Sequence, residues 1–505
     1  MGVLGTIVKT AFEINQKLHF ASDDPKEQQE EQLIDLLKTA KDTAFGKYYG
    51  FESILNSSDI LETYRKNVPI HTYKRMRFWW DQQQLLPDIS WPGKPDYFAL
   101  TSGTTGKSSK RIPVTEDFAE SMKKVGLSLA RNLPNFNLPE EVFESRVLVL
   151  GSSADLKQHE NGHLEGEISG INFNNFSDWY KFIYAPGKEI NAIDDWEKRL
   201  ERIVEEAPNW NIGSIAGIPS WVLLMLKAIM ERYELENIQE IWPNFQVYVS
   251  GGVAFETYRK DFEEISNKEL IIIDTYLASE GFFAYSDHPD SLDMTLAIAH
   301  GYFYEFIPFD ERGINEQGEI LDDPEIVELN EVEENQEYVL VISTCAGAWR
   351  YVVGDTIKFT QLSPYKITLT GRLKFFLNVV GSQLSEEKLD KGILELSEYF
   401  EISINEYMVA ALKDKNGNYY HQWCVVCDEE LNEEKAADYL DETLQNLNKN
   451  YRIERSKALK DVRLKQVFKK SYSDFLEEKK KMGGQVKIPK VIKAEKMREF
   501  IDFVD

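Results

Sequence analysis

The stretch Tyr97–Lys110 reads YFALTSGTTGKSSK, a short apolar run followed by a loop rich in Ser, Thr and Gly that ends in lysine. The apolar run is typical of a β-strand, and the glycines after it allow a backbone to approach a ligand closely. Hydroxyl and amide groups in such a loop can donate hydrogen bonds to phosphate oxygens. The stretch therefore predicts either a strand that leads into a phosphate-binding loop or an ordinary surface turn.

The segment Thr101–Ser108 nearly matches the Walker phosphate loop, G-x-x-x-x-G-K-[ST], but Thr101 stands in the place of the first Gly. A Walker loop must also open a helix, because the N-terminal amides of that helix hold the phosphates. Pro113 and the polar or β-branched residues around it do not start a helix there. A helix is expected only after Thr115, with Glu116 and Asp117 in its first turn, so a P-loop NTPase is disfavoured.

Further β-rich runs follow along the chain and alternate with helical stretches such as Trp221–Tyr233. These runs are RVLVLGSS, FQVYVSGG, LIIIDTY and EYVLVIST. Their alternation with helices predicts an α/β fold in which layered sheets have largely buried strands.

The pattern changes after Arg372. Two strand-like runs are joined by a turn at Asn416-Gly417, and an amphipathic helix follows. An Asn-Gly turn between such runs is typical of a β-hairpin. We therefore expect a large N-terminal lobe over residues 1–371 and a small α+β domain over residues 372–505.

The composition narrows the classes of partner. The chain has 505 residues, with 58 Lys+Arg against 85 Asp+Glu and a formal net charge of −27. A surface this acidic repels nucleic acid and anionic membranes, so neither is expected as a partner. No apolar run reaches the roughly 18–20 residues of a membrane span, and the N-terminus lacks the features of a secretory signal. The chain has three cysteines, too few for a disulfide scaffold, which suits a reducing compartment. We expect a cytoplasmic monomer.

Two short strings resemble functional motifs without the structural setting that those motifs require. The string from His159 to His163 fits the zinc-protease pattern H-E-x-x-H, but Asn161 and Gly162 disfavour the necessary helix, so a loop is expected. Cys424 and Cys427 lie in a β-patterned run, where their sulfurs would point to opposite faces of a sheet. Strand packing is therefore expected there, and not a redox pair.

Five segments resemble, in the same order, the motifs of the adenylate-forming superfamily. They are Thr101–Lys107 (TSGTTGK), Ser250–Ala254 (SGGVA), Tyr276–Glu280 (YLASE), Tyr351–Asp355 (YVVGD) and Gly371–Lys374 (GRLK). Finer details, among them TSGTTGKSSKRIPVT, SGGVAFETYRK, LASEGFF and GGQVKIPK, are similar to the GH3-type acyl acid amido synthetases, above all to bacterial members. The resemblance covers essentially the whole chain. It implies that the small C-terminal domain is mobile and that the active site lies between the two parts.

The resemblance also implies a reaction. A carboxylate would attack the α-phosphorus of ATP, pyrophosphate would leave, and the amine of an amino acid would attack the acyl-adenylate to give an amide and AMP. The acid would be an aromatic or alkyl carboxylic acid. An acyl-CoA ligase that uses the same adenylate is one alternative, and a non-catalytic adenylate-binding protein is another.

Individual residues receive roles from the same resemblance. ATP would be held at its phosphates by Ser102, Gly103, Thr104, Thr105, Gly106 and Lys107, at adenine by Gly251, Gly252 and Tyr276, and at ribose by Asp355 and Arg372. Ser279 would donate to the α-phosphate and Glu280 would ligate Mg²⁺, a cation that prefers oxygen ligands. Lys487 would be the catalytic lysine of the small domain, carried into the site when that domain closes.

Some assignments stay open. Because Ser108-Ser109 precede Lys110 where the superfamily has Pro-Lys, either Lys107 or Lys110 would be the phosphate contact. Val352 replaces the superfamily's Arg, so any role of that Arg is absent. The aromatic residues beside the motifs would either line an acyl pocket or belong to the core: Trp221, Phe255, Phe282 and Phe283.

A test of these roles is that Thr104, Ser279, Asp355 and Arg372 converge on one cleft. We also expect a locally basic site within the acidic body. It would collect Lys107, Lys110, Arg111, Arg372, Lys374 and Lys487 against Glu280 and Asp355.

Overall fold

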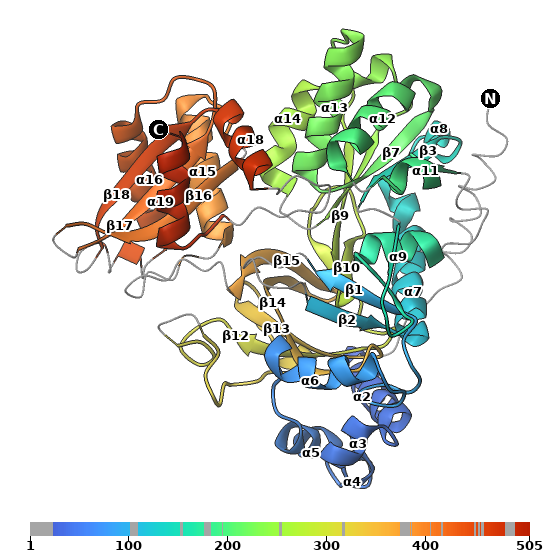
Figure 1. Ribbon diagram of the computed structural model, residues 1–505. Coiled ribbons are helices and arrows are strands. Elements are labelled where there is room, and N and C mark those ends of the chain that lie inside the picture. Colours follow the sequence, from blue (N-terminus) through green and yellow to red (C-terminus); the bar gives the residue numbers. More distant parts are fainter. Residues whose placement is uncertain are drawn as a thin grey trace.

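The computed structural model describes residues 24–101, 110–151, 155–175, 183–193, 195–251, 255–315, 319–373, 384, 386–404, 406–415, 418–448, 451–452, 455, 459–479 and 490–504. Figure 1 shows three regions: N-terminal helices in blue at the bottom, a central body of strands with helices above it, and a C-terminal unit in orange and red at the upper left.

Within the described residues, an 11-stranded sheet runs through the central body in the order β12-β13-β14-β15-β11-β10-β9-β8-β7-β3-β6. The strands from β6 to β9 pair in parallel, and those from β9 to β12 are antiparallel. Their bounds are β3 (Arg146–Leu150), β6 (Tyr184–Ala185), β7 (Ile212–Gly217), β8 (Val247–Gly251), β9 (Ile271–Ala278), β10 (Gly281–Ser286), β11 (Met294–Leu296), β12 (Tyr302–Pro308), β13 (Glu337–Thr344), β14 (Ala348–Leu362) and β15 (Tyr365–Arg372). The predicted α/β class is confirmed, and the predicted strands are β3, β8, β9 and β13.

Helices cover the parallel half of the sheet, because parallel strands must be joined by crossovers (Figure 1). They include α8 (Glu140–Phe143), α11 (Lys188–Asn191), α12 (Trp196–Glu206), α13 (Pro219–Tyr233), α14 (Arg259–Glu264) and the 3₁₀ helix η4 (Phe255–Tyr258). Helix α9 (Ile168–Asn175) packs elsewhere, because its Ile168 and Ile171 belong to a different core. The helix predicted near residues 221–233 is thus confirmed as α13. Its buried residues, such as Val222 and Leu226, form a core with Trp242 and Tyr248.

The antiparallel half packs on a second, larger core that contains residues of the N-terminal helices. These helices are α2 (Pro25–Ala40), α3 (Ala44–Tyr49), α4 (Phe51–Leu55), α5 (Ile60–Asn67) and α6 (Tyr73–Gln83). A four-stranded sheet, β2-β1-β5-β4, lies beside it and consists of β1 (Tyr97–Thr101), β2 (Lys110–Val114), β4 (Lys157–Gln158) and β5 (Leu164–Gly166). The helix predicted after Thr115 is α7 (Glu116–Asn132), and the Thr115 hydroxyl caps it by accepting a hydrogen bond from Phe118 N at 3.1 Å.

The C-terminal unit is built on a three-stranded sheet with helices on both faces (Figure 1). Its elements are α15 (Glu386–Phe400), β16 (Glu406–Lys413), β17 (Tyr419–Val426), α16 (Glu433–Leu447), β18 (Leu459–Val467), α18 (Lys469–Glu478) and α19 (Ala494–Val504). The predicted pairing of the two strands is confirmed, since β16 and β17 are antiparallel, and the predicted turn at Asn416-Gly417 lies outside the described residues. Cys424 and Cys427 are buried in different cores of this unit, as their strand position predicts.

The boundary between residues 371 and 372 stays a prediction; β15 ends there, and the strands that follow form their own sheet. No helix in the described ranges combines the length and apolar character that a membrane crossing requires.

Candidate active site

A lysine, a glutamate and a tyrosine from three separate elements meet beside the central sheet. Lys110 is the first residue of β2, Glu280 is at the tip of the β9–β10 hairpin, and Tyr351 is in β14. Lys110 Nζ donates to Tyr351 Oη at 3.0 Å and lies 3.3 Å from Glu280 Oε1, and the Tyr351 hydroxyl donates to the same Oε1 at 3.3 Å. Each group therefore contacts the other two.

The charge on Lys110 is stable in this position. Burial opposes the ammonium form, but the neighbouring Glu280 carboxylate and Tyr351 hydroxyl more than offset that effect and raise the pKa of Lys110. Burial raises the pKa of Tyr351 as well, so its hydroxyl remains protonated and able to donate. At neutral pH the site thus presents a fixed cation next to a carboxylate.

A second cluster joins Tyr276, Asp355 and Arg372. The Tyr276 hydroxyl donates to Asp355 Oδ2 at 2.8 Å, and Arg372 Nε lies 3.0 Å from Asp355 Oδ1. Asp355 and Arg372 are direct partners in the register of β14 and β15. Each carboxylate oxygen of Asp355 thus has one of these two partners.

Gly354 explains how Asp355 reaches this position. The pairing of β13 with β14 shifts between Val339 and Val341, which are opposite Thr356 and Val352, so β14 carries extra residues at this point. Gly354 has φ +96°, a conformation that residues with a side chain rarely adopt. A bulge of this kind changes the direction in which the next side chain points.

The two clusters share their supporting elements. Tyr276 and Glu280 lie four positions apart across the end of β9, and Tyr351 and Asp355 are four apart in β14. The Glu280 carboxylate is also close enough to contribute, after the larger effect of Asp355, to the raised pKa of Arg372. Two cations and two carboxylates therefore form one continuous polar site.

Several predicted residues lie outside the described ranges: Ser102, Gly103, Thr104, Thr105, Gly106, Lys107, Gly252, Lys374 and Lys487. The convergence of Thr104 with the other motifs therefore stays a prediction. Ser279 is next to Glu280 in the hairpin turn and is half-buried. Gly251 ends β8, where an added Cβ would lie 2.9 Å from Thr275 Oγ1, so this strand end has no room for a side chain.

Three of the four candidate acyl-pocket aromatics are in hydrophobic cores. Trp221 and Phe255 are buried in the core of the parallel half, and Phe283 is buried in the larger core. Phe282 is only partly buried. Tyr276 is 3 % exposed, and its ring packs edge-on against Phe283 with centroids 5.1 Å apart. Its role in stacking on adenine stays a prediction, whereas its hydroxyl contacts Asp355 directly.

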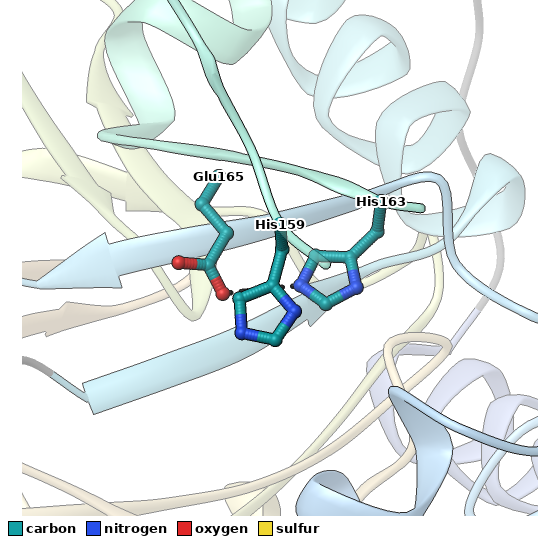
Figure 2. A group of neighbouring side chains, drawn as sticks. All are labelled: His159, His163 and Glu165. Atoms are coloured by element: carbon teal, nitrogen blue, oxygen red, sulfur yellow. Dashed lines mark hydrogen bonds and ion pairs between the residues drawn. The ribbon is translucent and has the colours of Figure 1, made fainter. Parts of the chain in front are cut away.

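Arg111 does not join Lys110 at the site. Successive residues of a strand point to opposite faces, and Arg111 Nε lies 2.7 Å from Glu165 Oε1 on β5. His163 Nε2 is 3.0 Å from the same oxygen, and His159 stacks on His163 (Figure 2). The predicted loop is confirmed, since residues 159–163 form the turn between β4 and β5.

His159, His163 and Glu165 offer ligand atoms within 4.8 Å of one another. The two imidazole rings are nearly parallel, however, at 12° with centroids 4.6 Å apart. The lone pairs of the ring nitrogens lie in the ring planes and so do not converge on one ion. Because Arg111 also supplies the counter-charge of Glu165, this arrangement is that of an ion pair beside a loop.

Sequence reasoning gave no role to Tyr351 and left Lys107 and Lys110 as alternatives. Tyr351 is the first residue of the YVVGD segment, so the sequence contains the motif but does not predict the contacts of Tyr351 with Lys110 and Glu280. The partners of Lys110 depend on the β1–β2 register, in which Lys110 is opposite Thr101. No single stretch of sequence carries that information.

The chain resembles known proteins over most of its length. Three family models match the chain: the GH3 family N-terminal domain at residues 14–200, the GH3 family central domain at residues 295–372 and the GH3 family C-terminal domain at residues 387–496. Among solved structures, a GH3.15 acyl acid amido synthetase superposes with a TM-score of 0.77 and 16% identity, covering 98% of this chain and 96% of that one. A 2-hydroxyisobutyryl-CoA ligase in the postadenylation state gives a TM-score of 0.58 and 11% identity, covering 96% and 95%. At these identities the two structures show a shared fold.

Two curated plant proteins illustrate the sequence similarity. The indole-3-acetic acid-amido synthetase GH3.2 of Arabidopsis thaliana is 30% identical over 235 residues, which are 43% of this chain and 42% of that protein. The jasmonoyl–L-amino acid synthetase GH3.5 of Oryza sativa subsp. japonica is 30% identical over 179 residues, 32% of this chain and 30% of that protein. The chain thus aligns with less than half the length of these relatives.

Proposed function

Because the chain belongs to the GH3 family, we propose that it is an ATP-dependent ligase that adenylates a carboxylic acid and joins the acyl group to an amino acid. AMP and pyrophosphate would be released. The named activities of the relatives, which act on indole-3-acetic acid and form jasmonoyl amino acids, support a small organic acid as the substrate class.

One observation carries the proposal: residues from three of the five motif segments, together with Lys110, gather in one polar site. Tyr276 and Glu280 come from the third segment, Tyr351 and Asp355 from the fourth, and Arg372 from the fifth. These segments are far apart in the chain and meet only through the sheet topology. Such a gathering of charged and hydroxyl groups is expected of a nucleotide site and not of a purely structural core.

The first reaction step concentrates negative charge on the phosphates of ATP, so the protein must supply orientation and positive charge. Lys110, with its raised pKa, is suited to hold that charge beside the α-phosphate. Asp355, fixed by Tyr276 and Arg372, is suited to accept hydrogen bonds from the ribose hydroxyls. Ser102, Thr104, Thr105 and Lys107 would bind the leaving phosphates.

Glu280 fits a magnesium ligand. Its side chain is 8 % exposed, and both hydrogen bonds that described residues make to it go to Oε1, so Oε2 can accept a hard cation. When bound, Mg²⁺ would neutralise phosphate charge. The half-buried Ser279 next to it would donate to the α-phosphate.

In the second step the amine of an amino acid would attack the activated carbonyl, and Lys487 would reach the site from the small domain. We propose that the chain acts as a cytoplasmic monomer on these small molecules, without nucleic acid or membrane partners.

Exchange of ³²P between pyrophosphate and ATP, measured with a panel of carboxylic acids, tests the proposal. Acid-dependent exchange is expected, and a positive acid identifies the substrate. Supplying that acid and ATP with either amino acids or CoA then shows which acceptor is consumed. ATP binding without exchange for any acid would refute the enzyme function, and consumption of CoA alone would replace the amido synthetase by an acyl-CoA ligase.

A further inference from the structure

A buried lysine links the C-terminal unit to the nucleotide site. Lys490 is 5 % exposed, and its Nζ lies 2.6 Å from Asp390 Oδ1 and 3.9 Å from Glu386 Oε1, both on α15. A lysine is almost never buried unless it is paired. Its backbone lies against β16, where Lys490 O accepts from Val409 N at 2.8 Å.

The neighbours of Lys490 hold its charge in place. Burial opposes the ammonium form, but Asp390 and Glu386 more than offset that effect, and the pKa of Lys490 is raised. The Tyr407 hydroxyl donates to Asp390 Oδ1 at 2.6 Å, and the Lys490 ammonium lies 5.3 Å from the centre of the Tyr407 ring. The ion pair is therefore fixed on several sides within a region that excludes water.

The first turn of α15 carries this ion pair to the edge of the candidate active site. An added Cβ on Gly371 would lie 2.6 Å from Glu386 Cβ and 3.1 Å from Glu386 N, so the helix start packs directly on the residue before Arg372. After the larger effects of Asp355 and Glu280, the Glu386 carboxylate also contributes to the raised pKa of Arg372.

The same turn is tied to the central sheet. Lys358 Nζ on β14 lies 2.5 Å from Glu387 Oε1, and Lys388 Nζ lies 3.9 Å from Glu337 Oε2 on β13. Further along α15, Leu389 and other apolar residues are buried in the core of the C-terminal unit. The helix thus bridges the two parts of the chain at Arg372.

We propose that Lys490 is a positioning residue for adenylation, which holds Glu386 and Asp390 on α15 and thereby keeps Arg372 opposite Asp355 at the ribose side of the site. The inference rests on the proposed function, because it assumes that Arg372 and Asp355 bind ATP. Lys490 itself does not contact the nucleotide.

Isothermal titration of the full chain with Mg·ATP tests this role without requiring the acid substrate. Lys490→Met is expected to weaken ATP binding about tenfold, and Lys490→Arg, which keeps the cation, is expected to restore most of the loss. Lys479→Met is the matched control, since Lys479 pairs with Glu499 at 2.7 Å on the surface of the same unit, and it is expected to leave ATP binding unchanged.

A double variant separates positioning from general loss of structure. If Lys490 acts through Arg372, then adding Lys490→Met to Arg372→Met causes little further loss, because residues that act together are not additive. The proposal would be overturned if the losses of ATP affinity in the two single variants were fully additive in the double variant. Wild-type ATP affinity in a folded Lys490→Met protein would overturn it as well. If Lys490→Met does not fold, Asp390→Asn removes the same ion pair with little change of shape, and unchanged affinity there counts equally against it. A wild-type chain that binds ATP but shows no exchange refutes only the proposed function.

Discussion

Replacing Lys110 by Met removes the only cation that the described residues place on Glu280. The side chain of Lys110 is 28 % exposed and that of Glu280 is 8 % exposed, so the pair is largely but not fully withdrawn from water. Breaking a fully buried pair by removing one partner costs about 3–5 kcal/mol, and the remaining exposure of Lys110 favours the lower end, about 3 kcal/mol. Since typical stabilities are about 5–15 kcal/mol, the variant is expected to remain folded.

The expected effect on catalysis is larger. Removing one charged or hydrogen-bonding group that stabilises a transition state slows reactions about 10²–10³-fold. Methionine retains most of the length of lysine and an apolar stem, so the loss reports mainly on the charge. We therefore expect Lys110→Met to reduce acid-dependent pyrophosphate exchange by at least about 100-fold, with the melting temperature measured in parallel to account for stability.

Two further variants make the experiment decisive. Lys123→Met is the matched control, because Lys123 forms an exposed pair with Glu120 on α7, and wild-type exchange is expected. Lys107→Met resolves the alternative that the sequence leaves open. If Lys110→Met kept more than a third of wild-type exchange while Lys107→Met lost it, then Lys107 would be the phosphate contact and Lys110 would only balance Glu280.

Three other predictions follow from the described geometry. Gly371→Ala places a side chain at φ +142° and 2.6 Å from Glu386 Cβ, so urea unfolding should show a free energy of unfolding about 3 kcal/mol below wild type. Gly126→Ala, in open space on α7, is the control and should cause no loss of stability. Burial raises the pKa of Asp274 to about 7, above its unfolded value of about 3.9, so this group makes stability decrease as pH rises from about 4 to 7. In urea unfolding, Asp274→Asn should remove that decrease: its free energy of unfolding should exceed that of wild type by about 2–4 kcal/mol at pH 8 and equal it near pH 4. An equal increase at both pH values would contradict the shifted pKa. Glu280→Gln should raise the Mg²⁺ concentration for half-maximal exchange about tenfold or more, and an unchanged Mg²⁺ titration would remove Glu280 from the metal site.

Short stretches of sequence predicted candidate residues and helix starts better than they predicted side-chain contacts. Glu280 and Asp355 were identified from the resemblance of the YLASE and YVVGD segments to known motifs; Glu280 lies just after β9, whereas Asp355 lies within β14. The capped start of α7 followed from Thr115 and the acidic first turn. In each case the signal lies within a few neighbouring residues, where local backbone preferences decide the structure.

Other features depend on contacts between distant segments. Pro113 argued against a helix, but no strand was predicted at residues 110–114, although β2 is at the edge of its sheet, where proline is tolerated. Without that strand, the alternation that turns Arg111 away from Lys110 could not be seen. The expected basic cluster therefore included Arg111, which instead pairs with Glu165. The same limit applies to Lys490, whose partners are about a hundred positions earlier in the chain.

The charges of the described site bear on how it would attract ATP. Lys110 is balanced by Glu280 and Arg372 by Asp355, so the four groups sum to zero within a chain of net charge −27. A neutral site in an acidic body gives little long-range attraction for a polyanion. If the proposed function holds, the attraction would come from cations that join with the nucleotide, namely Mg²⁺ on Glu280 and the lysines that the motif resemblance assigns to the site, Lys107, Lys374 and Lys487. The paired groups would then mainly orient the nucleotide, with Lys110 as a local positive charge, and the added cations would offset most of the remaining phosphate charge.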